Sequence, residues 1–428
     1  MSSSALWRDP DFLKLWAGQT VSQVGSVVTR TALPLLALLV LHAGPTQMAG
    51  LTVARSVGVL LVALVAGAWV DRLRRRPLLV ATDLVRALLL FAVPAAFLAG
   101  YLRVELLYVV AFVVAALGTL FTSAYHAYVP GLVGAKRVLE ANSRIATSEA
   151  IAEVGGPGFA GALVQVVGAP FAILVDAVSF VASAASLAII RAPEARRPSR
   201  DGRRPIVHEI REGAARVRRS PLVFPVAASS VTEHFFGSFY AALYALFLLD
   251  DLHLSPLLIG LVISAGGVGS LAGSLLAGRL ARRIGLGPSM IACAATSSLI
   301  GVLTPLAAGP VLVATVMVFI PQLFGDALST MQWIGQDTVV QTATPDRVLG
   351  RVSATIEFLS HGVAPLGAIV AAFVAETLGV RAAIAVGWAG GATAVLWLFF
   401  SPLRGLRVTP SGTEGPAAVS PMEATVEG

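Results

Sequence analysis

The chain has little charge and almost no cysteine. Only 13% of its 428 residues are Asp, Glu, Lys or Arg, whereas soluble globular proteins average roughly 25%. The single cysteine, Cys293, excludes an intramolecular disulfide, and no His or Cys stands near it at a metal-ligand spacing. We therefore expect Cys293 to be a packing residue, and we do not expect a soluble protein.

Several chemical motifs are also absent. The sequence contains no P-loop, no paired nucleophile and base, and no metal-ligand spacing, so it gives no support for ATP use. Gly267, Gly269 and Gly273 superficially resemble a dinucleotide-binding loop, but they stand inside an apolar segment with no strand before it. That context favours close helix packing. The sequence therefore predicts no cofactor, no metal site and no enzyme activity.

What the chain has instead is long apolar segments. Hydrophobic residues make up 56% of the sequence, and they gather into runs close to the ~20 residues that cross a bilayer as a helix. The predicted spans in the first half are Leu13–Leu41, Gly50–Val70, Leu78–Gly100, Val104–Pro130, Asn142–Val167 and Pro170–Ile190. Those in the second half are Leu222–Leu249, Leu257–Ala281, Met290–Ala307, Val311–Gly335, Val352–Leu378 and Ala382–Phe400. We expect an all-α membrane protein with twelve transmembrane helices in two six-helix bundles, and no cleavable signal before the first one.

A polar section separates the halves and predicts four parts of the chain. Residues 1–190 form the first bundle, 191–221 a basic linker, 222–401 the second bundle, and 402–428 a disordered tail rich in Pro, Ser, Gly and Glu. Ile206, Ile210, Ala214 and Val217 recur in the linker at helical spacing among charges. This pattern predicts an amphipathic helix on the inner membrane surface. A disordered basic linker is the alternative.

The basic residues are distributed unevenly along the chain. All but five of the 31 Lys and Arg residues fall at the N-terminus, in alternate loops or in the tail. Because cytoplasmic loops of membrane proteins carry an excess of Lys and Arg, we expect a multi-pass protein of the cell inner membrane with both termini in the cytoplasm. The net charge of +7 therefore indicates topology and does not predict a nucleic-acid partner.

The two halves resemble one another. At an offset of 208 residues, Gly156-Pro157 matches Ala364-Pro365, and Gly50-Leu51 matches Gly260-Leu261 at an offset of 210. An internal duplication with six helices in each half is the parallel repeat of one large class of transporters.

The stretch Gly67–Pro77 ends one apolar run with a carboxylate and four arginines. It resembles the loop between helices 2 and 3 of major facilitator superfamily transporters, and a weaker copy contains Gly278, Arg282 and Arg283. The resemblance implies that Gly67 permits a close helix approach and that Asp71 faces the positive end of helix 11. Arg72 and Arg75 would then pair with acidic side chains and latch the outward-facing state. A plain topology anchor is the alternative.

Further stretches narrow the resemblance to one branch of that superfamily. It is the group of drug:proton antiporters that includes macrolide-efflux proteins and the enterobactin exporter, and it is resembled over the chain up to about residue 400. The stretches are Phe12–Gln19, Ser22–Gly25, Leu139–Ser143 and Glu212–Pro221. In addition, Gly156, Pro157 and Gly161 resemble the glycine-proline motif of helix 5 in antiporters, where glycines allow a close crossing and proline bends the helix.

Ionisable side chains inside apolar spans are costly and are therefore candidates for function. Glu149 and Glu153 stand four residues apart, which places them on one helix face, and their counterparts at an offset of 208 are Glu357 and His361. Two such pairs facing one cavity would suit proton uptake and release. The alternative is that these side chains only pair with buried arginines.

Other ionisable residues complete this set. Arg30 is the natural counter-charge for the acidic pair and should line the cavity, and Asp326 is a further candidate for proton coupling. Glu233 and His234 lie at a depth comparable to that of Arg30. Asp83 and Arg86, one turn apart, are expected to form a structural pair.

These features, with the resemblance, predict a secondary active exporter of small hydrophobic or amphipathic, drug-like compounds. Transport would be proton-coupled and would use alternating access around a central cavity with few charges on its walls. Alternatives are a siderophore or lipid exporter, or an importer of the same superfamily. A polytopic membrane enzyme or a non-transporting receptor would belong to a different class. The expected partners are a small-molecule substrate, protons and the bilayer, and we expect a monomer.

Overall fold

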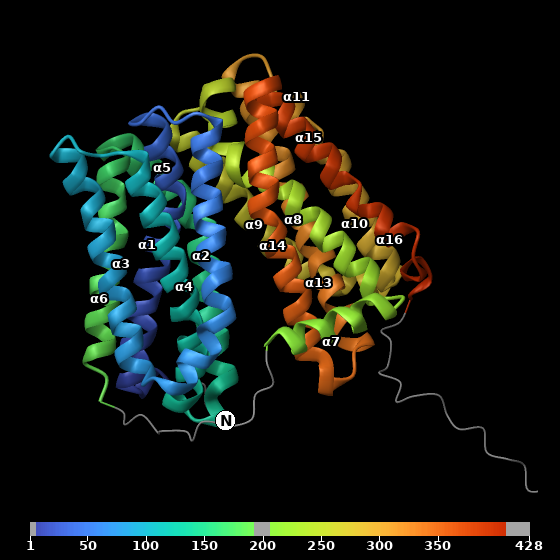
Figure 1. The fold of residues 1–428 in the computed structure, drawn as a ribbon, viewed down its shortest axis with the longest axis horizontal. Helices are drawn as coiled ribbons and strands as arrows, with labels where there is room; N and C mark the ends of the chain where they lie inside the picture. Colours follow the sequence, from blue (N-terminus) through green and yellow to red (C-terminus); the bar gives the residue numbers. More distant parts are fainter. Residues whose placement is uncertain (1–5, 192–205, 408–428) are drawn as a thin grey trace, which may run out of the picture.

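The computed structural model describes residues 6–191 and 206–407, without the side chains of residues 65, 67, 68, 71, 72, 135 and 206–212. This part of the chain is helical with no strand. Eleven of its helices are long and apolar enough to cross a membrane. Figure 1 shows the helices of the first and second halves as two groups that stand side by side.

Six long helices form the first group. They are α1 (Pro10–Leu39), α2 (Pro45–Arg72), α3 (Arg75–Leu98), α4 (Val104–Val133), α5 (Val138–Val167) and α6 (Ala169–Ala188). Within the group α1 packs against α5 and α6, α3 against α4 and α6, and α2 against α4. The N-cap of α1 is Asp9, whose carboxylate accepts from the backbone N–H groups of Asp11 and Phe12.

The second group contains the other helices. They are α7 (Ile206–Arg219), α8 (Val223–Leu246), α9 (Pro256–Ile284), α10 (Leu286–Gly301), α11 (Leu303–Leu306), α12 (Val311–Ile320), α13 (Asp326–Ala343), α14 (Asp346–Leu378), α15 (Val380–Ala392) and α16 (Ala394–Phe399). The spans predicted at 290–307, 311–335 and 382–400 correspond to the candidate spans Leu286–Leu306, Val311–Ala343 and Val380–Phe399. A short break in the α-helical pattern divides each of them. A π-helical turn, Pro321–Gly325, joins α12 to α13. Helix α8 is 24 residues long but is not among the eleven candidate spans; its sequence contains Glu233, His234 and several Ser, Thr and Tyr residues.

The backbone supports the internal duplication. His42 and His253 both adopt left-handed conformations, with φ of 50° and 54°. Each stands three residues before the proline that begins α2 or α9. Because non-glycine residues seldom adopt positive φ, the recurrence of this turn at matching places indicates that the halves repeat one structural plan.

The halves meet between α5 and α9 and between α2 and α14. We call the end of the molecule with the N-terminus and α7 the near end, and the opposite end, with residues 42–44, the far end (Figure 1). At the far end Thr46 donates from its N–H and Oγ1 to Glu376 Oε1, at 3.3 and 2.9 Å. The backbone N–H of Leu257 likewise donates to Gln165 Oε1 at 3.2 Å. Each half thus caps the first turn of a helix in the other half.

These two caps differ in charge, and removing them should have unequal effects. A hydrogen bond to a carboxylate contributes about 1.5–3 kcal/mol, against about 1 for a neutral one. We expect Glu376→Ala to raise the labelling rate of Thr52→Cys by an impermeant maleimide roughly tenfold, because Thr52 contacts Ala241 across the interface. Gln165→Ala should give a smaller rise. Equal labelling rates in both variants would contradict this ranking. The native cysteine, Cys293, is buried and should add little background labelling.

Helix α7 confirms that part of the linker is helical. Its side chains up to residue 212 are outside the described set, but those further on pack against α14. A Cβ on Gly213 would lie 2.1 Å from Thr355 Oγ1, and Val217 is buried. The described face of α7 is therefore seated on the second group of helices, and the disordered alternative is wrong for residues 206–219.

Candidate functional site

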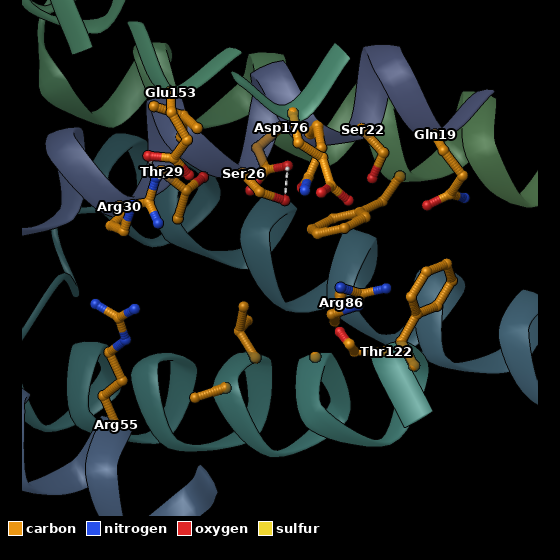
Figure 2. A pocket seen from close by; sticks show the side chains of 18 of the residues that line it. Gln19, Ser22, Ser26, Thr29, Arg30, Arg55, Arg86, Thr122, Glu153 and Asp176 are labelled. Carbon is orange, nitrogen blue, oxygen red and sulfur yellow. Dashed lines mark hydrogen bonds and ion pairs between the residues drawn. The ribbon is translucent and has the colours of Figure 1, made fainter. Parts of the chain in front are cut away.

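A cavity of about 400 Å³ lies in the first group of helices. All six helices α1–α6 line it, and Ala241 of α8 adds one contact from the other half. Figure 2 shows polar and charged side chains from several helices turned toward this space. Six charged residues line it: Arg30, Arg55, Arg86, Glu149, Glu153 and Asp176. The expectation of a cavity wall with few charges is therefore wrong.

Arg30 of α1 and Glu153 of α5 form an ion pair at this cavity. Arg30 Nη2 lies 2.6 Å from both Glu153 Oε1 and Oε2. The side chains are 43% and 52% exposed, so both are open to the cavity and are not enclosed by protein. The same two residues line a second cavity of about 570 Å³, which α9 and Asp326 border from the other half. The pair therefore lies where the halves meet.

Arg55 of α2 faces this ion pair from across the cavity (Figure 2). It interacts electrostatically with both Arg30 and Glu153. Within the described part of the chain, no carboxylate lies within ion-pair distance of Arg55. Two guanidinium groups therefore share one carboxylate, and any change in the charge of Glu153 alters the repulsion between them.

Glu149 lines the same cavity one turn before Glu153, as their spacing predicts. Its side chain interacts with Gln23 of α1 and with His126 of α4. The helix periodicity thus places two acidic groups on one wall, each opposite a different polar neighbour.

Asp83 and Arg86 form the expected pair on α3. Arg86 Nη2 donates to Asp83 Oδ1, and both side chains are buried. Arg86 also lines the cavity, where its guanidinium lies 4.7 Å from the ring centre of Phe121 and 4.1 Å from that of Phe180. Cation–π contacts of this kind stabilise a guanidinium away from water.

The candidate residues of the second half form separate groups. Glu233 accepts hydrogen bonds from Ser229 at 2.9 Å and from Gln332 at 2.5 Å. The rings of His234 and His361 are 5.0 Å apart and nearly perpendicular.

Glu357 is exposed and interacts electrostatically with His361. The 400 Å³ and 570 Å³ cavities are lined by other residues than Glu357, His361, Glu233 and His234. Helix α14 packs against α2 and α8, and the ring of His361 lies against that of His234 on α8. That both symmetry-related pairs face one cavity therefore stays a prediction.

Asp326 lies beside the second cavity with Arg30 and Glu153. The π-helical turn before it places Gln322 so that Nε2 donates to Asp326 Oδ2 at 2.8 Å. Tyr244 of α8 donates to Gln322 Oε1 at 3.1 Å. Such π turns recur at functional sites, and here the turn presents two polar side chains to the space between the halves.

The loop motif is described only in part. The backbone of Gly67, Asp71 and Arg72 belongs to α2, but their side chains lie outside the described residues, so the latch they would form stays a prediction. Arg75 donates to Ala127 O at 2.9 Å. In the second copy of the motif, Arg283 is exposed.

The other two residues of that copy, Gly278 and Arg282, line a third cavity, of about 460 Å³, at the end of α9. Arg282 therefore faces a space bordered by α9, α10 and α13.

The helix 5 motif brings the two halves into close contact. A Cβ on Gly161 would lie 2.3 Å from Pro256 O, and one on Gly260 would lie 2.3 Å from Pro157 O. Gly158 N–H donates to Ser264 Oγ across the same interface at 2.9 Å. Gly156 instead faces α1, where a Cβ would lie 2.5 Å from Val27 Cγ1. Glycine is needed at these crossings because backbone atoms or a branched side chain occupy the space a side chain would take.

Three polar residues of the site were not among the sequence candidates. Asp176 is a lone carboxylate in the apolar span 170–190, Arg55 a lone cation in the span 50–70, and Gln322 follows a proline in the span 311–335. The signal for the first two was present, since an ionisable residue inside a span is itself a functional candidate. The position of Gln322 depends on the π turn, which hydropathy does not show.

Comparison with known proteins gives consistent matches. The model of a family described as transmembrane secretion effectors of the major facilitator superfamily (MFS) matches residues 1–416. The multidrug efflux pump Tap of Mycolicibacterium fortuitum is 27% identical over 395 residues, covering 88% of this chain and 91% of that protein. The uncharacterised MFS-type transporter YvqJ of Bacillus subtilis (strain 168) is 23% identical over 311 residues, covering 72% of each chain.

Solved transporters share the fold. A bacterial homologue of the iron transporter ferroportin, in its inward-facing state, gives a TM-score of 0.69 at 20% identity, covering 91% of this chain and 98% of that one. The nucleoside transporter NupG gives a TM-score of 0.72 at 11% identity, covering 91% of this chain and 97% of that one. These likenesses confirm the predicted fold class, and the matched family and structures are transporters and not enzymes.

Proposed function

The chain belongs to the transmembrane secretion effector family of the MFS and is a multi-pass membrane transporter, and we propose that it exports small hydrophobic or amphipathic compounds by proton-coupled alternating access. The name of the multidrug efflux pump to which it is similar supports a drug-like cargo. The observation that carries the proposal is the Arg30–Glu153 ion pair, which is exposed to two cavities where the halves meet.

The ion pair supplies a two-state element. Glu153 is neutralised either by Arg30 or by a proton, and a proton on its carboxyl removes the charge that holds Arg30. A basic amphipathic cargo competes with the proton for the same carboxylate, so that cargo and proton occupy the site in turn. Mutual exclusion of this kind is what exchange of one for the other requires. Trp16, Phe121 and Phe180 supply aromatic surface for the apolar part of the cargo.

The far-end contacts between halves give the corresponding conformational proposal. We place both termini in the cytoplasm of the cell membrane on the distribution of basic residues, so that the near end faces inward and the far end is closed. Residues 1–190 and 222–401 then rock as two units of a monomer about α2, α5, α9 and α14, with 191–221 as the linker. Residues 408–428 of the proposed tail lie outside the described chain.

The test is transport in proteoliposomes with an imposed pH gradient and a basic fluorescent dye as cargo. We expect Glu153→Gln to abolish gradient-driven accumulation while dye counterflow without a gradient persists, because glutamine cannot cycle a proton. Glu105→Gln, an exposed carboxylate in the first turn of α4, is the matched control and should transport normally. Unchanged gradient-driven transport in Glu153→Gln would refute the coupling role.

Arg55 favours one specific alternative, an acidic cargo such as a siderophore or lipid headgroup. An anionic group would pair with Arg30 and Arg55, and a proton on Glu153 would then assist its binding by releasing Arg30. Proton and cargo would move in the same direction. An acidic dye that accumulates toward the alkaline side of the same proteoliposomes, where the basic dye does not, would establish this alternative.

A further inference from the structure

A second group of charges is buried between α3 and α6, away from the Arg30–Glu153 pair. Asp83, Arg86 and Asp176 are 0%, 6% and 1% exposed. Arg86 donates to Asp83 and interacts electrostatically with Asp176 as well. Two carboxylates thus share one guanidinium. If both are ionised, one negative charge remains without compensation, which is costly at a site withdrawn from water.

Hydrogen bonding shows which of the two carboxylates lacks a compensating positive charge. Both oxygens of Asp83 are engaged: Oδ1 by Arg86, and Oδ2 by Ser183 Oγ at 2.6 Å. Ser183 in turn accepts from Gln19 at 2.8 Å. Asp83 therefore has the surroundings of an ionised carboxylate.

The carboxylate of Asp176 has fewer and weaker hydrogen-bond partners than that of Asp83. Its Oδ1 lies 3.1 Å from Ser179 Oγ and 3.5 Å from Ser26 Oγ. Ser179 has one hydroxyl hydrogen, and the backbone O of Asp176 is nearer to it, at 2.8 Å. Oδ2 is buried with no hydrogen-bond partner, and so is Thr29 Oγ1, although Thr29 interacts with the same carboxyl group.

The helices packed around Asp176 offer no further cation. Helix α1 presents the hydroxyls of Ser26 and Thr29, and the next residue, Arg30, is held by Glu153. The charged groups that α5 adds to the shared cavity are the carboxylates of Glu149 and Glu153, and α3 contributes Arg86, already bonded to Asp83.

Arg55 of α2 and His126 of α4 also line the cavity, but Arg55 interacts with Arg30 and Glu153, and His126 interacts with Glu149. Neither acts on Asp176, whose charged neighbour is Arg86. Within the described part of the chain, a charge that compensates Asp176 must therefore come from outside the protein.

The site can be reached from the cavity. Asp176, Ser26, Thr29 and Arg86 all line the 400 Å³ space. Figure 2 shows Asp176 beside Ser26, with Thr29 further along α1 toward Glu153. At Gly25 of α1, a Cβ would lie 2.7 Å from Asp176 Oδ1, so glycine there leaves room for the carboxyl group.

We propose that Asp176 binds one monovalent cation, a proton or a sodium ion, at Oδ2, and that this site is separate from the Arg30–Glu153 pair. A proton on Oδ2 donates to Thr29 Oγ1 and gives both atoms a partner. A sodium ion in the same place takes oxygen ligands from Asp176, Thr29 and Ser26 and completes its shell with cavity water. Either ion restores charge neutrality to the buried group.

The proton arm of the test uses infrared spectroscopy of the purified full chain in nanodiscs at neutral pH. We expect Asp176→Asn to lose one carbonyl-stretch band of a protonated carboxyl group. Asp83→Asn should lose the same band, because Arg86 then has Asp176 as its single counter-ion. Glu105→Gln should retain it. Thr29→Val should keep the band but shift its frequency, because the hydrogen-bond acceptor is gone.

The sodium arm measures thermal unfolding in sodium chloride against choline chloride. If the ion is sodium, the wild type gains several degrees in sodium, as expected for a ligand that binds only the folded state, and Asp176→Asn gains none. Wild type and a folded Asp176→Asn that differ neither in the carboxyl band nor in the sodium response would overturn the proposal. Neither arm measures transport, so the outcome is independent of the coupling role of Glu153.

Discussion

Reversing the charge of either partner in the Arg30–Glu153 pair is expected to abolish transport, and the double reversal is expected to restore part of it. The pair is joined by two contacts of 2.6 Å. Two like charges about 4 Å apart repel by roughly 4 kcal/mol at an effective dielectric constant near 20. Each single reversal therefore replaces a favourable contact with a repulsion of that order, and the combined variant restores opposite charges.

The two single variants should not be equally damaging. Glu153→Arg would gather three guanidinium groups around the cavity, since Arg55 already faces the pair. Arg30→Glu would leave two carboxylates, which Arg55 partly compensates. We therefore expect Glu153→Arg to give the lower yield of folded protein and the lower thermal stability, although both fail to transport.

The measurement is a double-mutant cycle on yield, thermal stability and dye transport. A coupling term in stability of about 0.5–3 kcal/mol is typical of residues in contact. Glu105→Arg provides a charge reversal at an exposed position, where an effect within about 0.5 kcal/mol is expected. Additive effects in the cycle, with no recovery in the double variant, would show that the pair is not an interacting unit.

Much of the fold could be predicted from the sequence because each apolar run ends at a local signal. The predicted span Val104–Pro130 corresponds to α4, Val104–Val133, and Asn142–Val167 to α5, Val138–Val167. Helix α5 ends at Gly168, whose φ of 86° glycine adopts without strain. Such ends depend on a few adjacent residues, so they can be recognised without tertiary information.

The interruptions within the second half could not be predicted in this way. The segment from Val311 to Ile320 is apolar except for Thr315, so a count of hydrophobic residues cannot show where the hydrogen-bonding pattern changes. Pro321 lacks an N–H donor, and the π turn begins at that residue. Whether a proline ends, bends or widens a helix depends on the neighbouring helices that accept the new shape.

The candidate site shows the same division between local and tertiary information. Helical spacing placed Glu149 and Glu153 on one cavity wall, because that relation lies within α5. The same spacing could not place Glu357 and His361, since their surroundings depend on how α14 rotates against α2 and α8. The roles of Arg55 and Asp176 depend on partners on other helices, and the sequence of a single span does not show those partners.

Filling the glycine contact between the halves is expected to hold the far end open and to stop transport. A Cβ at Gly161 would lie 2.3 Å from the backbone O of Pro256 and 3.1 Å from Gly260 Cα. Real Cβ atoms do not approach backbone atoms so closely, and backbone cannot rotate aside as a side chain can. Helices α5 and α9 must therefore separate, and the closure at this end is lost.

Helix propensity predicts the opposite result for Gly161→Ala, so a loss of transport in this variant would point to the contact between α5 and α9. Alanine in place of glycine stabilises a helix interior by up to about 1 kcal/mol, so a harmful Gly161→Ala cannot be ascribed to the helix itself. Gly155→Ala and Gly155→Leu are matched controls on the same helix, because a Cβ at Gly155 meets nothing within 4 Å. We expect Gly155 variants to transport, Gly161→Ala to be impaired, and Gly161→Leu and Gly260→Leu to be inactive.

Accessibility separates a conformational effect from a folding defect. The contact joins α5 of one half to α9 of the other, and each half can keep its own helix packing when the two separate. Gly161→Leu should therefore be purified as a folded protein with thermal unfolding as cooperative as that of Gly155→Leu. Its Thr52→Cys derivative should react with an impermeant maleimide far faster than the same cysteine in the Gly155→Leu background, because Thr52 loses its contact with Ala241 when the far end opens. A folded Gly161→Leu that transports like the wild type would mean that α5 and α9 need not approach this closely at any point in the cycle.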